Sequence, residues 1–176
     1  MSRFLWTIYV QPLNRIIFFI VLLIAVWSIV GYKACKKKWW KLFNTATFLC
    51  SFAAIAFMTV YSRESGSPQV ILTPFHSFVE AKEHQEMYRS MLMNIFLFVP
   101  LGLSLPIVLP RRCHSAVNMC LTIVFGFALS AGIEWCQYRY GLGRCEVDDI
   151  IMNTLGIAVG ASSYVIARIP ERRLNK

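Results

Sequence analysis

The stretch from Glu134 to Gly160 reads EWCQYRYGLGRCEVDDIIMNTLGIAVG and joins two apolar, helix-length segments through a short polar turn. Asp149 and Asn153 are four residues apart, so they share one face of a helix. Gly156 and Gly160 continue that face and allow another helix to approach closely. The polar candidates near the facing ends of the two segments are Glu134, Gln137, Arg144, Asp148, Asp149 and Asn153. The stretch therefore predicts two packed helices with a polar site where they meet.

The composition favours a membrane protein. Of the 176 residues, 57% are hydrophobic and 15% are charged. An average soluble domain is about half apolar and about a quarter charged. The formal charge of +9 comes from short basic runs between apolar stretches, which is typical of cytoplasmic loops. Nucleic-acid binding is disfavoured, because no basic run faces an aromatic or polar recognition surface. We expect one domain over residues 1–176.

Five apolar segments are long enough to cross ~30 Å of hydrocarbon. The fold class is therefore an all-α integral membrane protein, a bundle of about five transmembrane helices. The predicted spans are residues 16–32, 42–61, 91–109, 115–138 and 149–167. Residues 1–14 are too short and too interrupted to span, which predicts an interfacial segment. The connection over residues 62–90 predicts an outer-surface loop with a short helix, and Pro100, Gly102 and Pro106 predict a broken third span.

The charge distribution predicts the orientation. With five spans, the basic loop over residues 33–41 lies on the same side as Arg111, Arg112 and the C-terminal tail. That side holds 11 Lys or Arg and one acid, whereas the other side holds 7 Lys or Arg and 8 acids. The positive-inside rule then places the N-terminus outside and the C-terminus in the cytoplasm of a multi-pass protein of the cell membrane.

Three spans place a polar side chain at a similar depth. Glu134, Asn153 and Asn94 each lie roughly 6 Å inside the outer boundary at ~1.5 Å per residue. Since a polar group that faces lipid is costly, we expect the three to converge in one outer-leaflet pocket. Gly126 and Ser130 on the fourth span are the expected partners of the two glycines of the fifth.

Structural explanations compete with functional ones. Asn94 and Asn153 alone are explained by hydrogen bonds between helices. Either Asp148 or Asp149 is expected to cap the fifth span, and Arg144 to pair with a nearby acid. A buried carboxylate such as Glu134 favours function. It could act as a general acid or base, join a cation site, or help recognise a polar ligand without chemistry.

The cysteines and histidines do not form a metal-site pattern. The six cysteines form no CxxC pair, so a structural zinc is not expected. Cys136 and Cys145 are the pair considered for a disulfide. No cofactor is predicted; the alternative is a divalent cation held by Glu134, Asp148 and Asp149.

Two motifs over residues 94–160 resemble the VanZ-like family. The first runs from Asn94 through Pro100 to Gly102. The second has the positions Glu134, Gln137, Arg144, Asp148, Asp149, Asn153 and Gly156. Members of this family are small multi-pass membrane proteins, and its founding member is associated with resistance to teicoplanin, a lipid-bearing glycopeptide. The resemblance implies a role in antibiotic resistance and supplies no catalytic residues.

Three hypotheses follow for the function. The first is a non-enzymatic protein whose outer polar site binds a lipid-linked cell-wall component or a lipoglycopeptide. The second is an intramembrane enzyme that acts on a phosphate-bearing, polyprenyl-linked lipid. The third is a small transporter or a chaperone, although a site at one side of the membrane disfavours transport, which needs polar groups near the midplane. The lipid bilayer is the one partner that all three hypotheses share.

Overall fold

The structure is a computed structural model that describes residues 3–34, 36–61, 69–82, 85–109 and 115–174. Within these ranges, side chains are described from residue 17 to residue 168, apart from the side chain of residue 85. Within these ranges the elements are α1 (Arg3–Ala34), α2 (Lys38–Ala56), the π-helical turn η1 (Phe57–Tyr61), β1 (Gln69–Ile71), α3 (His76–Glu80), α4 (Gln85–Val108), α5 (Ser115–Tyr140), β2 (Arg144–Glu146) and α6 (Val147–Leu174).

Five of the described helices are long and apolar enough to cross a membrane, which confirms the predicted fold class. The candidate spans are Ile17–Ala34, Lys38–Tyr61, Glu86–Val108, Ser115–Tyr140 and Val147–Arg168. The protein is thus a multi-pass membrane protein whose helices contact lipid. Residues 3–14, which belong to the predicted interfacial segment, are helical and continuous with the first span. Arg111 and Arg112 lie outside the described residues.

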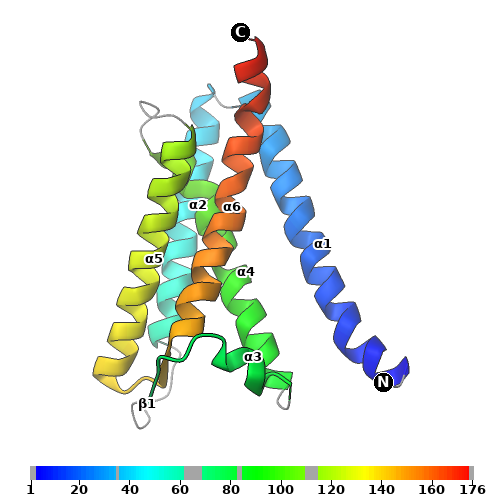
Figure 1. Cartoon of the computed structure of the whole chain (residues 1–176). Helices are drawn as coiled ribbons and strands as arrows, with labels where there is room; N and C mark the ends of the chain where they lie inside the picture. Colours follow the sequence, from blue (N-terminus) through cyan, green and yellow to red (C-terminus); the bar gives the residue numbers. More distant parts are fainter. Residues whose placement is uncertain (1–2, 35, 62–68, 83–84, 110–114, 175–176) are drawn as a thin grey trace.

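Helix α6 packs mainly on α4 and α5, while α1 meets it near the C-terminal end and diverges from the bundle towards its own N-terminus (Figure 1). Glycines make the contact between α4 and α6 close. A Cβ on Gly156 would overlap the backbone carbonyl of Ile95, and a Cβ on Gly160 would overlap that of Val99. A Cβ on Gly102 of α4 would overlap the backbone carbonyl of Ile157 in the same way. We call Gly102, Gly156 and Gly160 the glycine seam.

The expectation that these glycines pack on the fourth span was wrong. The fourth span, α5, meets α6 through larger groups, because Gly126 receives the side chain of Ile157. Ile157 is fully buried and forms a core cluster with Ile55, Phe98, Leu101 and Ile133. Four helices, α2, α4, α5 and α6, thus meet at this buried cluster. Helix α6 makes backbone contact with α4 and side-chain contact with α5.

The predicted break in the third span was also wrong. Helix α4 is continuous through Pro100 and Pro106. Each proline removes one donor and frees one carbonyl, a loss that a packed membrane helix tolerates when neighbouring groups compensate. The Ser104 hydroxyl donates to the Pro100 carbonyl at 2.8 Å, so the buried hydroxyl of Ser104 has a partner within its own helix.

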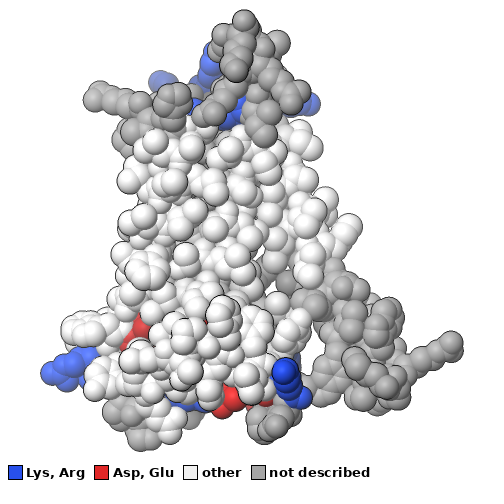
Figure 2. All heavy atoms as spheres, viewed as in Figure 1, with Lys and Arg blue, Asp and Glu red and all other residues white. Residues whose placement is uncertain are grey.

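The two ends of the bundle differ in charge (Figure 2). Among the described side chains, those of Lys33, Lys36, Lys37, Lys38, Lys41 and Arg168 lie at the end near the C-terminus, with no acid beside them. The opposite end holds acids as well as bases. There β1 pairs in parallel with β2, with Val70 opposite Cys145, and α3 lies beside the start of α4. We call this second end the acidic end.

Candidate functional site

Two glycines shape the turn that begins the site. Helix α5 ends at Tyr140, and Gly141 follows with φ of 63°, a left-handed conformation that glycine adopts without a steric cost. The Leu142 N–H donates to the Gln137 carbonyl at 2.8 Å and closes the helix end. Gly143 has φ of 114° and directs the chain into β2. The turn thereby lays β2 across the ends of α5 and α6.

Three helices bring polar side chains together just inside the acidic end. Asn94 of α4 donates from Nδ2 to Oδ1 of Asp149 on α6 at 2.6 Å. One turn further along α6, Asn153 donates from Nδ2 to Oγ of Ser130 on α5 at 2.9 Å. One turn from Ser130, Glu134 accepts the backbone N–H of Glu146 at 2.9 Å. Because α5 and α6 run antiparallel, Ser130 and Glu134 lie alongside Asn153 and Asp149.

The Cys145 thiol lies near two carboxylates of the site. It is hydrogen-bonded to Glu134 and lies within electrostatic range of both Glu134 and Asp149. Burial raises the pKa of the Cys145 thiol, and the two carboxylates and Glu146 raise it further, since each disfavours a thiolate. We call Asn94, Ser130, Glu134, Cys145, Asp149 and Asn153 the inner cluster.

The inner cluster is largely shielded from solvent. Glu134 is 2% exposed and Asn153 is 3% exposed, whereas Asn94 and Asp149 are half-buried. Among the described residues, the Asn153 Oδ1 atom has no hydrogen-bond partner. A buried amide oxygen without a donor is costly, and such atoms commonly mark a position for a water molecule or a ligand. The three residues predicted to converge, Asn94, Glu134 and Asn153, each hydrogen-bond to a group on another element.

A second group of side chains holds the connection between η1 and α4 on the bundle. Asp148 accepts the backbone N–H of Phe75 at 2.6 Å and that of Ser77 at 2.7 Å. The Ser77 hydroxyl donates to Glu146 at 3.0 Å. Asp148 was one of two acids expected to cap the fifth span. Its carboxylate instead satisfies the start of α3, a helix distant in sequence. We call Asp148, Glu146 and Ser77 the loop anchor.

The remaining two candidates also have structural partners. Arg144 lies 3.3 Å from Glu146 and 3.5 Å from Glu80, so its expected pairing with a nearby acid is present. Gln137 donates to the carbonyl of Thr59 at 2.8 Å, which lies in the π-helical turn η1. Carbonyls in the last turn of a helix lack a partner within the helix, and Gln137 uses one of them to join α5 to η1.

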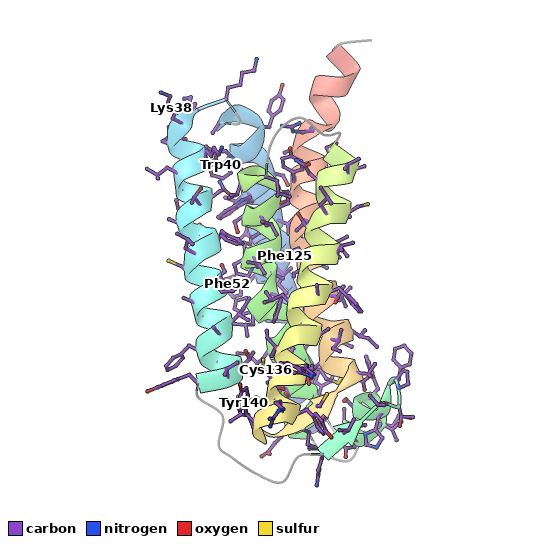
Figure 3. All side chains as sticks on the ribbon, turned by 90° about the vertical axis from the view of Figure 1, so that its left-hand side faces the viewer. Lys38, Trp40, Phe52, Phe125, Cys136 and Tyr140 are labelled. Carbon is purple, nitrogen blue, oxygen red and sulfur yellow. The ribbon has the colours of Figure 1, made fainter. Side chains whose placement is uncertain are left out.

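The structure does not assemble the cation site considered for Glu134, Asp148 and Asp149. Asp148 turns towards the loop, and the described residues contain no group of three or more His, Cys, Asp or Glu side chains placed to hold a metal ion. Cys136 and Cys145 are both free thiols. Figure 3 shows Cys136 on α5 one turn before Tyr140, at the end of the bundle where the loop lies.

Sequence reasoning did not find the roles of Ser77, Glu80 and Thr59. Ser77 follows Pro74 at the start of a short helix, and a serine at such a position commonly bonds to local or neighbouring polar groups. Thr59 carried no signal, because its contribution is a backbone carbonyl, a group that every residue type has.

Comparison with known proteins identifies the family. The model of the family described as VanZ/LLP1 matches residues 19–168, which include the inner cluster and the loop anchor. The chain belongs to the VanZ/LLP1 family. It is similar to Protein VanZ of Enterococcus faecium, with 27% identity over 77 residues. That alignment covers 44% of this chain and 45% of the relative, so the chain spans less than half of that protein's length in the match. No solved structure matches the chain.

Proposed function

We propose that this VanZ-like protein binds a lipid-linked cell-wall component or a lipoglycopeptide at the inner cluster, and so modulates resistance to teicoplanin-like antibiotics. The observation that carries the proposal is the buried Glu134 carboxylate of α5, which is 2% exposed and accepts the backbone N–H of Glu146 on β2. An ionisable group within a span is expensive, and its default explanation is function. Membership of the VanZ/LLP1 family supports the choice of antibiotic class.

The chemistry of the inner cluster favours a ligand that is rich in hydrogen-bond donors. Glu134 and Asp149 present carboxylate oxygens, and Asn153 presents a buried oxygen that has no donor among the described residues. Hydroxyls, amide N–H groups and ammonium groups complement such a set of acceptors. Glycans and peptides of the cell wall carry all three, and so do glycopeptides.

A phosphate-bearing lipid fits the same cluster less well. An anionic phosphate would meet Glu134 and Asp149, and like charges disfavour that approach. Arg144, which precedes Cys145 on β2, already pairs with Glu80 and Glu146. The binding function is therefore preferred to the alternative of an intramembrane enzyme acting on such lipids.

The orientation belongs to the same proposal. The N-terminus and the acidic end lie outside, and the C-terminus lies in the cytoplasm, since the opposite end carries the unbalanced basic side chains (Figure 2). A cysteine placed in the C-terminal tail should resist a membrane-impermeant thiol reagent in intact cells. Rapid labelling from outside would reverse the orientation and would remove the inner cluster from the reach of an extracellular drug.

The test of function is drug susceptibility in a Gram-positive host with and without the protein. We expect the protein to raise the inhibitory concentration of teicoplanin more than that of vancomycin, because vancomycin lacks a lipid tail. An equal effect on both drugs would assign recognition to the shared peptide core. No effect on either drug, at a normal level of protein in the membrane, would contradict the proposed role.

A further inference from the structure

The connection between η1 and α4 exposes large apolar side chains although it lies outside the spans. Leu72 is 67% exposed, Val79 is 64% exposed and Phe75 is 59% exposed. Phe78 is also exposed, and its ring packs against that of Phe75 at 5.8 Å between centroids. Contiguous exposed apolar groups of this kind mark an interaction surface. We call Leu72, Phe75, Phe78 and Val79 the apolar strap.

The strap is polar on the inside and apolar on the outside. Ser77 is 1% exposed, and its hydroxyl donates to Glu146. The backbone N–H groups of Phe75 and Ser77 both donate to Asp148. The polar groups thus face the bundle, whereas the apolar side chains on either side of Ser77 point away from it. In water this arrangement is unfavourable, because the apolar surface has no cover.

The depth of the strap follows from its hydrogen bonds. Asp148 is the second residue of the span Val147–Arg168, so the backbone at Phe75 and Ser77 lies within hydrogen-bonding distance of the span boundary. Helix α3 also packs beside α4, whose span begins at Glu86 (Figure 1). The strap is therefore at the level of the lipid headgroups, next to helices whose exposed side chains face the bilayer.

The position of the strap is rigidly specified. Phe75 has φ of 64°, an uncommon conformation for an aromatic residue. The two hydrogen bonds to Asp148 hold the backbone on either side of it, and the pairing of β1 with β2 fixes the preceding segment. A surface loop with no partner has no need of such support. The anchored conformation is what directs both phenyl rings away from the bundle.

We infer that the apolar strap inserts into the bilayer surface at the acidic end of the bundle. The apolar side chains of the strap contact lipid at the boundary between headgroups and acyl chains. This contact continues the lipid contact already made by the spans. Aromatic side chains are favoured at that level, and shallow insertion of an apolar face is a common mode of interfacial binding. The strap would fix the height of the inner cluster relative to the membrane surface. This inference stands independently of the proposed drug resistance.

The test is photo-crosslinking of the full chain in phosphatidylcholine vesicles, with p-benzoylphenylalanine in place of Phe78 or, separately, of Val79. Phe127, exposed on the middle of α5, is the positive control, and Lys82, exposed beyond α3, is the negative control. We expect phospholipid adducts at Phe78 and Val79 within about twofold of the yield at Phe127, and at least about fivefold above that at Lys82.

Two results would overturn the inference. The first is a yield of lipid adduct at both strap positions no higher than at Lys82, with normal adducts at Phe127, which would place the strap in water. The second is a dominant crosslink between two copies of the chain, which would make the strap a protein interface. The adduct at Phe127 verifies that the protein inserts under these conditions, and flotation of each strap variant with the vesicles verifies its own insertion, so a negative result at the strap is decisive.

Discussion

Helix α6 makes two different contacts along one face. Towards α4 it presents Gly156 and Gly160, and the two backbones approach so closely that no side chain fits between them. Towards its start it presents Asp149 and Asn153, which hydrogen-bond to α4 and α5. The first contact has no chemistry available beyond packing. The second places acidic and amide groups where apolar side chains would pack at lower cost.

The difference separates the residues that assemble the helices from the residues that the assembled helices position. Without a hydrophobic driving force between helices in lipid, close backbone packing is a main source of association. Polar contacts add little on average, roughly 0.6 kcal/mol each. The glycine seam therefore accounts for assembly, and the inner cluster is more than assembly requires. Changes to the two regions should separate stability from function.

The largest expected effect comes from the seam. Gly156→Leu places a large side chain against the carbonyl of Ile95, and overpacking of this kind costs ~3 kcal/mol or more where backbone must move. We expect little folded protein in the membrane. Gly132→Leu is the matched control, since no described atom lies within 4 Å of a Cβ added there. The measurement is the amount and the thermal unfolding of each variant in detergent; equal behaviour of the two would contradict a structural seam.

A smaller and more local effect is expected at the loop anchor. Asp148→Ala leaves the N–H groups of Phe75 and Ser77 without their acceptor, at about 1–3 kcal/mol for each unsatisfied group. The bundle should stay folded while backbone amide exchange over residues 69–82 rises about tenfold or more. Hydrogen exchange with mass spectrometry measures this. Glu86→Ala, at an exposed position of the same end, should leave the exchange of the loop unchanged.

The mildest effect is a change in reactivity without a change in fold. Burial and nearby carboxylates raise the pKa of the Cys145 thiol, so the thiolate fraction is small near neutral pH and alkylation is slow. Glu134→Gln removes one carboxylate charge, which lowers the pKa of this thiol and speeds its alkylation. Peptide-level mass spectrometry over a range of pH follows Cys145 separately from the other cysteines. An unchanged profile would mean that Glu134 does not act on this thiol.

The sequence predicted those features that local rules determine. Hydropathy located five spans, and helical spacing placed Asp149 and Asn153 on one face with Gly156 and Gly160. Rules of this kind do not identify partners. Gly156 and Gly160 contact α4, whereas α5 approaches α6 through Ile157. Which helix meets which face of α6 depends on how the helices pack together.

Long-range contacts explain the remaining differences. Asp148 looked like a cap for its own helix, yet it bonds to residues more than seventy positions earlier in the chain. The parallel pair of β1 and β2 was not predicted, because each strand has three residues and is specified only by the other. Pro100 and Pro106 suggested a break, whereas the surrounding bundle keeps α4 continuous.

The most direct test of the account is resistance in cells that express Glu134→Gln, normalised to the amount of protein in the membrane. This variant keeps the shape of the side chain and its acceptor for the Glu146 N–H, but it loses the charge. Glu86→Gln, an equal change at an exposed position of the same end, is the control. We predict a normal membrane level and teicoplanin resistance reduced to that of cells without the protein, with Glu86→Gln unaffected. Full resistance with Glu134→Gln at a normal level would show that Glu134 serves only to join α5 to β2.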